Sequence, residues 1–517
     1  MNSGINRRTF LRALGTTVAF TSLPAIGQIE GGGLSKPAGK RPRAGHDVRE
    51  FSLPPDLAPF SLLSLVLGRI SGNSVTVSAL ARDSMEGRLE YGTTPGRYDH
   101  QMPGFTLVPG QPLDLVLDHL QPDTEYFYRV QCRQPGEAVF QARPECRFHT
   151  QRSPGRAFTF AIQGDSHPER PQMSDPELYA RTLLTAAAGR PDFYLCMGDD
   201  FSVDTLQSIN AETVNGRYLL QRPFLGLVGR SAPVFLVNGN HEQASLFNFN
   251  QPGLQHEVAV LAQNARNRFY PTPAPDAFYS GDTEPLKDIG LRKDYCAWTW
   301  GDALFVILDN YWHSPARVDN NFRSESANGG KAGHQGGGLH DGWGITLGNA
   351  QYQWFKRTLE QSRAKFKFVF AHHVLGTGRG GVDECDLFEW GGRNRRGDWE
   401  FARERPGWEL PVHQLMVKHG VTIFFQGHDH LYCRQERDGV VYQEVPMPAD
   451  PGYSTFNEDR YEYGLKLPNS GHLQVAVSPD EVSVDYVRSF LPKDESVGRK
   501  TGDSAHRYTI RPRTGHA

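Results

Sequence analysis

Short apolar runs that end in polar residues occur repeatedly through the middle of the chain. The clearest run, 192–197, begins after Pro191 and stops at Gly198-Asp199-Asp200. A short apolar run bounded in this way predicts a buried strand whose end releases polar side chains into a crevice at the edge of a sheet. Four further runs share the pattern, namely 157–162, 234–237, 367–371 and 421–426.

The residues that follow these five runs are mostly carboxylates, histidines and one asparagine. In chain order they read Gly164-Asp165-Ser166-His167, Gly198-Asp199-Asp200, Gly239-Asn240-His241-Glu242, His372-His373 and Gly427-His428-Asp429-His430. One such ending is weak evidence for a site. Five of them indicate a single crevice that collects them all.

Helical patterns separate several of these strands, which predicts a layered α/β (α+β) domain over residues 156–490. The helices are expected at 176–188, 349–364 and 410–420. Since no helix separates the last runs of this domain, antiparallel strands should close it. These runs are 440–445, 472–477 and 482–487.

Residues 52–151 show a different pattern, in which short strands follow one another without a helical period. This pattern predicts an all-β sandwich. The segment from Leu120 to Tyr126 resembles the corner of immunoglobulin-like and fibronectin type III sandwiches, where a tyrosine hydroxyl returns to the backbone. The strands are expected at 62–70, 74–81, 88–91, 113–117, 126–132 and 146–150.

Polar segments rich in glycine or proline lie between and beyond these two domains. We expect 28–51 to be a linker, 151–155 a hinge and 491–517 a polar C-terminal tail. The Gly-rich segment 317–348, which carries His334 and His340, is long for a loop in a compact domain. Such loops are functional lids or are disordered.

The first residues resemble a targeting segment. The stretch Asn6-Arg7-Arg8-Thr9-Phe10-Leu11-Arg12, followed by mildly apolar residues, is similar to a twin-arginine export signal, which residues 1–27 would form. A basic N-terminal arm is the alternative. The signal implies a periplasmic or secreted protein. Because no later run reaches about 18 apolar residues, we do not expect an integral membrane protein.

The charge balance excludes a global attraction to nucleic acid. The 517 residues contain 55 Lys and Arg against 58 Asp and Glu, a formal net charge of -3. Specific nucleic-acid binding is therefore not expected, and any recognition of phosphate must be local. The six cysteines form no CxxC pair, which argues against a thiolate zinc site. Cys132 and Cys146 lie on successive predicted strands. The sequence does not decide between a disulfide and two free thiols at these positions.

Seven side chains at the strand ends offer oxygen and nitrogen ligands without a thiolate. Such a set suits Zn, Mn or Fe better than Ca or a sulfur site. Two metal ions about 3.5 to 4 Å apart need a shared anionic ligand, which a carboxylate can provide. We expect Asp199 to be this bridge. The seven candidates are Asp165, His167, Asp199, Asn240, His372, His428 and His430.

The ordered series of five strand endings resembles the signature of the calcineurin-like metallophosphoesterases. The sandwich before it, with Glu90-Tyr91-Gly92-Thr93-Thr94-Pro95-Gly96, is similar to the N-terminal domain of purple acid phosphatases. The resemblance implies two divalent or trivalent metal ions (Fe, Mn or Zn), one held by Asp165, His167, Asp199 and His430 and the other by Asp199, Asn240, His372 and His428. His373 is the alternative ligand beside His372, and Asp429 is expected to support the ligands or to lie on the surface.

In this family the histidine after the ligand asparagine, here His241, contacts the phosphate or protonates the leaving oxygen. The resemblance therefore implies an exported phosphohydrolase that cleaves a small-molecule phosphate monoester or diester by attack of a metal-bound hydroxide. Two other functions remain open. One is a cell-surface binding module with an idle metal domain, and the other is a metallo-hydrolase of non-phosphate esters.

One position departs from the purple enzymes. They carry a tyrosine ligand three residues after the bridging aspartate, where this chain has Ser202, and their first motif lacks a histidine at the position of His167. We therefore expect the iron-tyrosinate chromophore to be absent.

The segment between His373 and the helix expected at 410–420 combines arginines with tryptophans. Arginine forks suit phosphate oxygens and tryptophan faces suit a base or sugar, so we expect at least one of these arginines to contact the substrate. A solvated loop whose arginines pair with Asp398, Glu400 and Glu404 is the alternative. The candidates are Arg379, Arg393, Arg395 and Arg396.

Overall fold

The computed structural model describes residues 51–318, 342–374 and 378–512. The expected export signal, the linker as far as residue 50, and His334 and His340 lie outside these ranges. Within them, no helix is both long enough and apolar enough to cross a membrane.

Two β-sheets make up the first part of the described chain. Their strands are β1 (Leu63–Gly68), β2 (Val75–Ala81), β3 (Met85–Gly92), β4 (His100–Gln101), β5 (Phe105–Leu107), β6 (Leu113–Leu117), β7 (Glu125–Arg133), β8 (Gln141–Ala142) and β9 (Cys146–His149). One sheet has the order β1-β2-β6, and the other is built around the antiparallel pair β3 and β7. Alternate residues of β7 are buried, as expected for a strand with one face on a core.

The corner contact expected near Tyr126 is present. The Tyr126 hydroxyl accepts a hydrogen bond from the backbone N–H of Gln121 at 2.9 Å. Cys132 and Cys146 are both buried and free, so the two strands that carry them are not joined by a disulfide.

The segment 151–155 makes hydrogen bonds to residues far along the chain. The Gln151 side chain donates to the carbonyl of Thr299 at 2.8 Å. The Arg152 guanidinium makes two hydrogen bonds, of 2.7 and 3.0 Å, to the carboxylate of Asp192. The sequence predicts a hinge here from local composition, whereas these contacts come from residues distant in sequence.

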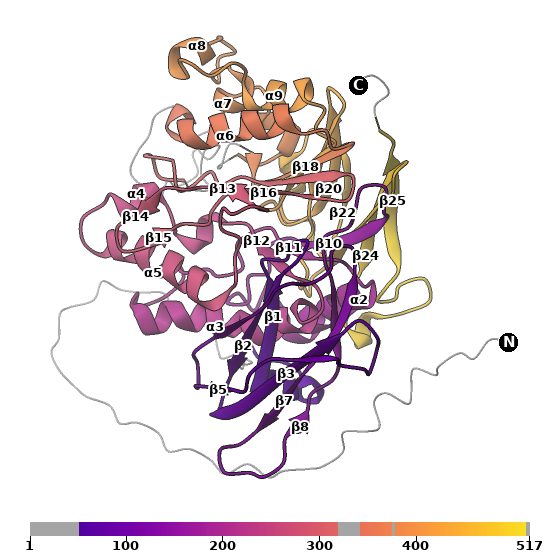
Figure 1. The fold of residues 1–517 in the computed structure, drawn as a ribbon. Coiled ribbons are helices and arrows are strands. Elements are labelled where there is room, and N and C mark those ends of the chain that lie inside the picture. Colours follow the sequence, from indigo (N-terminus) through magenta and orange to yellow (C-terminus); the bar gives the residue numbers. More distant parts are fainter. Residues whose placement is uncertain (1–50, 319–341, 375–377, 513–517) are drawn as a thin grey trace, which may run out of the picture. The chain divides into compact units, whose positions relative to one another are not determined.

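Helices and two larger sheets form the rest of the described chain (Figure 1). The first sheet has the order β12 (Val234–Leu236), β11 (Tyr194–Cys196), β10 (Phe158–Gln163), β23 (Gly471–Val477), β24 (Val482–Arg488) and β25 (Ser504–Ile510). The second has the order β13 (Ser280–Gly281), β16 (Cys296–Trp300), β17 (Ala303–Ile307), β18 (Phe366–Phe370), β19 (Ile423–Gln426), β21 (Val440–Glu444), β20 (Tyr432–Arg437) and β22 (Leu465–Leu467). A small hairpin joins β14 (Pro285–Leu286) to β15 (Gly290–Leu291).

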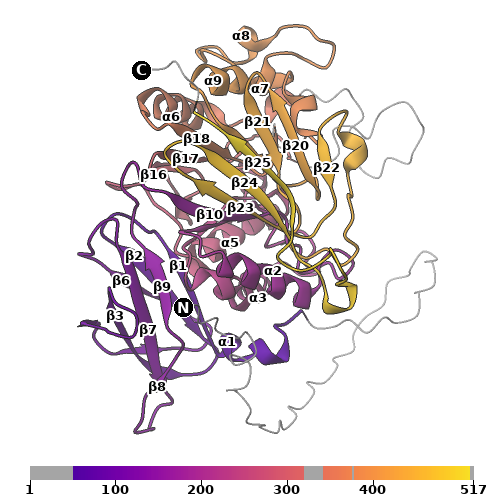
Figure 2. The ribbon, with the colours of Figure 1, turned by 90° about the vertical axis from the view of Figure 1, so that its right-hand side faces the viewer.

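Helices cover the outer face of each sheet (Figures 1 and 2). The α-helices of the described ranges are α1 (Pro59–Leu62), α2 (Pro176–Ala188), α3 (Ala211–Gly229), α4 (Leu246–Phe249), α5 (Leu254–Phe269), α6 (Gly348–Gln361), α7 (Phe388–Gly391), α8 (Phe401–Glu404) and α9 (Val412–Lys418). Neighbouring strand residues point to opposite layers. Thus Phe160 and Phe305 meet in the core between the sheets, whereas Ala161 packs with α2, α3 and α5, and Val306 packs with α6, α7 and α9. The layered α/β arrangement expected from the sequence is therefore confirmed.

Buried hydrogen bonds join the first two strands to α3. Arg222 in the middle of α3 is fully buried, and its guanidinium donates to the carbonyls of Ser78 at 2.8 Å and Ser64 at 3.4 Å. It also donates to the carbonyl of Phe269. Ser64 Oγ in turn donates to the carbonyl of Arg222 at 2.7 Å. A Cβ at Gly226 would lie 2.9 Å from Ser64 Oγ, so a glycine permits this close approach.

The sequence reading missed several elements. Neither α3 nor α5 was expected, and α3 carries Pro223 in its interior, which interrupts the helical pattern. The helix begins where the Asn210 side chain accepts from the N–H groups of Glu212 and Thr213. The expected tail after residue 490 contains β25, an edge strand whose Tyr508 hydroxyl donates to Gln443 at 3.0 Å.

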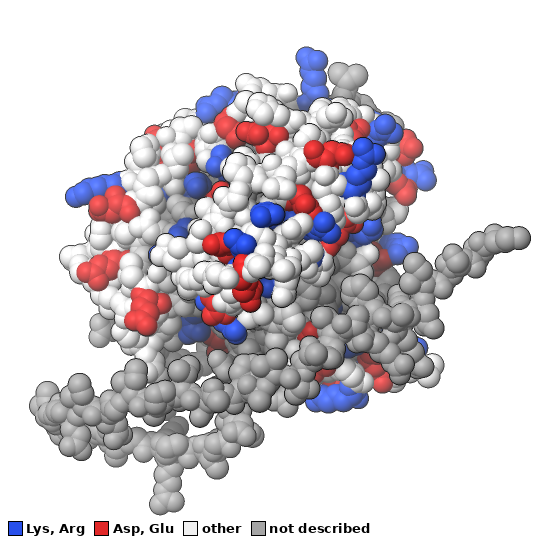
Figure 3. Space-filling model, turned by 60° about the horizontal axis from the view of Figure 1, so that its bottom comes forward, with Lys and Arg blue, Asp and Glu red and all other residues white. Residues whose placement is uncertain are grey.

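Acidic and basic side chains are interspersed on the face drawn in Figure 3. This distribution agrees with the small net charge of the chain.

Candidate metal centre

Loops at the carboxyl ends of parallel strands carry the predicted metal ligands. By strand, these are Asp165 and His167 after β10, Asp199 after β11, Asn240 and His241 after β12, His372 after β18, and His428 and His430 after β19. In parallel sheets such loops gather at one edge and form the usual ligand crevice. Positive φ angles of 39°, 57°, 78° and 60° occur at His167, Asp199, His428 and His430. Left-handed backbone at residues other than glycine is strained and clusters at functional sites.

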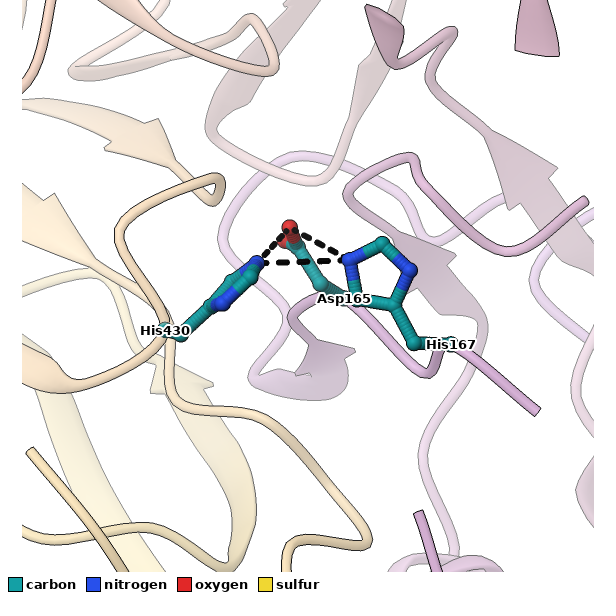
Figure 4. A group of neighbouring side chains, drawn as sticks. All are labelled: Asp165, His167 and His430. Carbon is teal, nitrogen blue, oxygen red and sulfur yellow. Dashed lines mark hydrogen bonds and ion pairs between the residues drawn. The ribbon is translucent and has the colours of Figure 1, made fainter. Parts of the chain in front are cut away.

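The first group of possible ligands consists of Asp165, His167 and His430 (Figure 4). Asp165 Oδ2 lies 3.0 Å from His430 Nε2 and 3.8 Å from His167 Nε2. The two imidazole nitrogens are 3.3 Å apart. All three side chains are buried, and their ligand atoms point toward one another (Figure 4). This geometry suits three donors around one cation.

The second group consists of Asp199, His372 and His428. His372 Nδ1 donates to the carbonyl of Met197 at 2.8 Å, which leaves the lone pair of Nε2 free for a metal. That Nε2 lies 3.1 Å from Asp199 Oδ2, yet neither atom has a hydrogen-bond partner. Both ring nitrogens of His428 and Oδ1 of Asn240 are also buried and unpartnered within the described ranges. Buried polar atoms are normally bonded, so these donors fit a cation site.

Asp199 lies between the two groups. Its Oδ2 is 3.1 Å from His372 Nε2 and 3.9 Å from His167 Nε2. Its other oxygen, Oδ1, accepts the backbone N–H of His241 at 2.9 Å, which fixes the carboxylate. A Cβ at Gly239 would lie 2.2 Å from that same Oδ1. Only glycine therefore permits the β12 loop to approach Asp199 this closely.

Glu242 holds the Asp199 loop in place. Its carboxylate is fully enclosed and accepts the backbone N–H groups of Gly239 at 2.8 Å, Asp199 at 3.2 Å, Asp200 at 2.8 Å and Phe201 at 3.1 Å. One buried side chain thus connects the loops after β11 and β12. The sequence placed Glu242 in a motif without giving it a role.

The electrostatics of the centre favour forms that bind cations. Burial alone would raise the pKa of Asp165 and of Asp199, but the neighbouring histidines, His372 foremost, together hold both pKa values below the usual range. Burial lowers the pKa of His428, and the nearby Arg379 lowers it further. Ionised carboxylates and neutral imidazoles are the states in which these side chains coordinate metal.

His372 shows the opposite shift. Burial would lower its pKa, but the carboxylates of Asp199 and Asp165 raise the pKa to about 10. A cation in the centre would compete with that proton, because the same two carboxylates attract both.

His241 lies beside the centre and is paired with Asp204. Its Nδ1 is 2.6 Å from Asp204 Oδ2, and its Nε2 is 3.7 Å from Asp199 Oδ2. Burial would lower the pKa of His241, but Asp199 and the hydrogen bond to Asp204 raise the pKa to about 9. The imidazole is therefore protonated near neutral pH. The sequence reading gave no role to Asp204, although it lies only five residues after Asp199.

Two residues just after His167 were also missed. Glu169 Oε1 lies 3.2 Å from His167 Nδ1, so this carboxylate orients a ligand imidazole. Arg170 pairs with Glu169 at 3.1 Å and places Nη2 3.1 and 3.2 Å from the two ring nitrogens of His241. Their position directly after Gly164-Asp165-Ser166-His167 is the only feature of the sequence that indicates a role for them at the centre.

His373 and Asp429 lie outside the two groups described above and outside a further possible group of His167, Asp199 and His241. His373 Nδ1 is 3.2 Å from the Tyr311 hydroxyl. Asp429 accepts from the N–H of Gly380 at 2.8 Å and from the Tyr461 hydroxyl at 2.7 Å. These bonds support the loop that carries His428 and His430.

The four candidate arginines are placed differently from one another. Arg379 Nη1 donates to the carbonyl of His428 and to Asp429 Oδ1 at 3.1 Å, next to the centre. Arg393 donates to the carbonyl of Gly397 within its own loop. Arg395 lies 3.7 Å from the carboxylate of Glu384, and Arg396 is exposed. Of the four, Arg379 therefore contacts the loop that carries His428 and His430.

Protein loaded with iron should lack the visible charge-transfer band of the purple enzymes. Ser202 stands where those enzymes carry tyrosine, and its Oγ is 3.3 Å from His167 Nδ1. The Tyr194 hydroxyl donates to Gln163 at 3.0 Å and lies outside the ligand groups. Visible absorption spectroscopy of the iron-loaded protein measures whether the charge-transfer band is present. A violet protein would contradict the expectation and point to a tyrosine ligand such as Tyr311, whose ring centroid is 6.5 Å from that of His372.

Comparison with known proteins agrees with this geometry. The chain is 30% identical over 165 residues to a phosphoenolpyruvate phosphatase of Allium cepa, which covers 29% of this chain and 33% of that protein. It is 24% identical over 155 residues to tartrate-resistant acid phosphatase type 5 of Oryctolagus cuniculus, covering 28% of this chain and 41% of that protein. The matched region thus spans well under half of each relative's length.

A solved structure of PhoD has the same fold. The two structures align with a TM-score of 0.57 over 88% of this chain and 90% of that one, at 13% sequence identity. The sequence profile of calcineurin-like phosphoesterases matches residues 158–432, more than half of the chain and all of the strand ends described above. The chain belongs to the calcineurin-like phosphoesterase family.

Proposed function

We propose that the chain is an exported enzyme that hydrolyses phosphate esters at a centre of two metal ions. The observation that carries the proposal is the position of Asp199 Oδ2, which is unbonded and lies between His372 and His167. One carboxylate oxygen there can serve two cations. The oxygen and nitrogen donors suit Fe, Mn or Zn.

The chain's own residues divide between the two ions. Asp165, His167, Asp199 and His430 would hold one, and Asp199, Asn240, His372 and His428 the other. When bound, the two ions would neutralise charge on the phosphoryl oxygens and acidify water for the attack on phosphorus. Glu242 holds the bridging loop through four backbone N–H groups, so the donors are positioned before any substrate arrives.

His241 is the group that moves a proton. Asp204 holds Nδ1 and thereby directs Nε2 toward the space beside Asp199. Since the raised pKa keeps the imidazole protonated, Nε2–H can donate to the alkoxide oxygen that leaves phosphorus. General acid catalysis of this kind contributes roughly 10² to 10⁴ in rate.

Two other functions make different demands on the same site. A binding module with an idle metal domain would not need so complete a set of buried donors, which argues against it. A hydrolase of carboxylate esters could use the same donors, so activity on phosphate esters against carboxylate esters is what separates the two functions. Both curated relatives are phosphatases by name, which favours a phosphomonoester as the first substrate to test.

Elemental analysis and a panel of esters test the proposal. Protein purified with its native metals should hold two ions per chain. It should cleave p-nitrophenyl phosphate or bis(p-nitrophenyl) phosphate, the second only if it is a diesterase. A chelator should abolish the rate and added metal should restore it. Cleavage of p-nitrophenyl acetate alone, or of none of the three, would overturn the proposal.

We also propose that residues 52–151 form a fibronectin type III-like domain ahead of the catalytic domain at 156–490. The two sheets and the bond from Gln121 N–H to the Tyr126 hydroxyl support it.

Export should depend on Arg7 and Arg8, because the residues that follow are too mildly apolar for a strong membrane signal. The Arg7→Lys, Arg8→Lys variant should remain in the cytoplasm, which cell fractionation measures. The matched control is Arg12→Lys, which keeps the pair and should be exported. Normal export of the double variant would rule out the twin-arginine route.

A further inference from the structure

Two side chains beside the metal centre are open to solvent. The ligands themselves are enclosed, with side-chain exposures of 1% for Asp199 and 8% for His430. By contrast, the Arg170 side chain is 22% exposed and Phe456 is 42% exposed. These two residues therefore mark places where a molecule from solvent can meet the centre.

Arg170 is held firmly on the His241 side. Its backbone N–H donates to the carbonyl of His167 at 3.0 Å, and its carbonyl accepts from Met173 and Ser174. The guanidinium pairs with the buried carboxylate of Glu169 at 3.1 Å. A cation fixed in this way loses little side-chain entropy when it binds an anion.

Phe456 is held on the His430 side. The two rings are 5.9 Å apart between centroids and nearly perpendicular, at 84°. The neighbouring Asn457 donates its side-chain amide to the carbonyl of Asp429 at 2.9 Å, which ties this segment to the loop with the ligand histidines. An isolated exposed aromatic residue is common on protein surfaces. This one is distinguished by its fixed position against a metal-ligand ring.

We propose that Arg170 and Phe456 are the specificity-determining residues of the site: Arg170 binds a phosphate oxygen of the substrate, and Phe456 packs against a flat unsaturated ring on its alcohol. The inference rests on the proposed function, because it places the phosphate over the ligand histidines that separate the two residues. The ring centroid of His167 is 5.2 Å from that of His241, beside Arg170, and 5.1 Å from that of His430, beside Phe456. Arg170 and Phe456 therefore both lie close to the metal ligands. The substrate class is then phosphate esters of aromatic or nucleoside alcohols.

Equilibrium binding of phosphonates tests this without any turnover. Phenylphosphonate and methylphosphonate share the anion and differ in the ring. In metal-loaded protein, Phe456→Ala should weaken phenylphosphonate about fivefold and leave methylphosphonate unchanged, as expected for loss of one aromatic contact. Phe456→Tyr keeps the ring and should restore the preference. Arg170→Gln should weaken both ligands about tenfold or more, since each loses a charge-assisted hydrogen bond, and Arg170→Lys should recover part of the loss.

Two exposed residues of the same chemical types, one aromatic and one arginine, serve as controls. Tyr463→Ala removes an aromatic side chain that is 47% exposed. Arg82→Gln removes an exposed guanidinium just after β2, far along the chain from the ligand loops. Neither should change either dissociation constant. Elemental analysis should give the same metal content for all variants, which separates substrate binding from damage to the centre. Comparing adenosine 5′-phosphate with ribose 5-phosphate then distinguishes a nucleoside from a simple aryl group.

The outcomes separate the inference from the function on which it rests. If Phe456→Ala leaves the ratio of the two phosphonate constants unchanged, the aromatic part is wrong. If Arg170→Gln binds both normally, the anion part is wrong. If Trp399→Ala or Arg396→Gln, rather than Phe456→Ala, abolishes the preference for phenylphosphonate over methylphosphonate, the loop at 393–399 recognises the ring. A protein that cleaves no phosphate ester but retains the ring preference would contradict the function and not these two residues.

Discussion

Asp199→Asn should abolish turnover and lower the occupancy of both metal sites. The amide is neutral and offers one weak oxygen donor, where the carboxylate offers an anionic oxygen between His372 and His167. Charge stabilisation by a metal centre is worth several kcal/mol, so kcat should fall by about 10³ or more. Elemental analysis and steady-state kinetics on the same preparation measure the two effects together.

Asp200→Asn is the matched control for this experiment. The same chemical change falls on the next residue, whose Oδ1 accepts from Ser166 at 2.6 Å and Gln163 at 2.8 Å. Burial, with Glu242 and Asp165 nearby, raises the pKa of Asp200 well above its usual range. The control should keep both metals. Two metals and a normal rate in Asp199→Asn would disprove the bridge.

His241→Ala should keep both metals and lose roughly 10² or more in kcat. Its Nε2 lies 3.7 Å from Asp199 Oδ2, and in the proposed mechanism the imidazole lies beside the leaving group. The loss should be smaller for esters with good leaving groups, which need no proton. An equal loss for good and poor leaving groups would instead assign His241 to positioning the phosphate.

The pH profile gives a second readout of the same residue. A general acid works only while protonated, so kcat should fall as pH rises through the pKa of His241. That alkaline limb should be absent in His241→Ala and shifted to lower pH in Asp204→Asn, because the carboxylate raises the pKa. A limb that persists unchanged in His241→Ala would belong to another group.

The sequence predicted the strands at the centre of the fold well because their signal is local. Each run, such as the one before Asp199, is apolar on both faces and stops at a glycine or a polar residue, which is typical of a buried parallel strand. The order of the five endings then narrowed the site to specific residues. The structure brings these residues together, including Asp165 and His430, which are 265 positions apart.

The residues that orient the ligands could not be predicted in the same way. Glu169 and Asp204 act through loops whose course depends on left-handed backbone at His167 and Asp199. No periodicity encodes such turns. The edge strand β25 was missed for a related reason, because its alternate residues are polar and exposed and it is defined by pairing with β24.

The buried guanidinium of Arg222 bears on how this protein can be cut and studied. A fragment that begins at residue 156 would remove Ser64 and Ser78, which supply three of the four acceptors bonded to this guanidinium, and leave a cation in an apolar surface. Each buried group left unsatisfied costs about 1 to 3 kcal/mol, against a total stability of about 5 to 15 kcal/mol. The catalytic half should therefore be insoluble or proteolytically labile when expressed alone, and the first two sheets are best regarded as part of its folding unit.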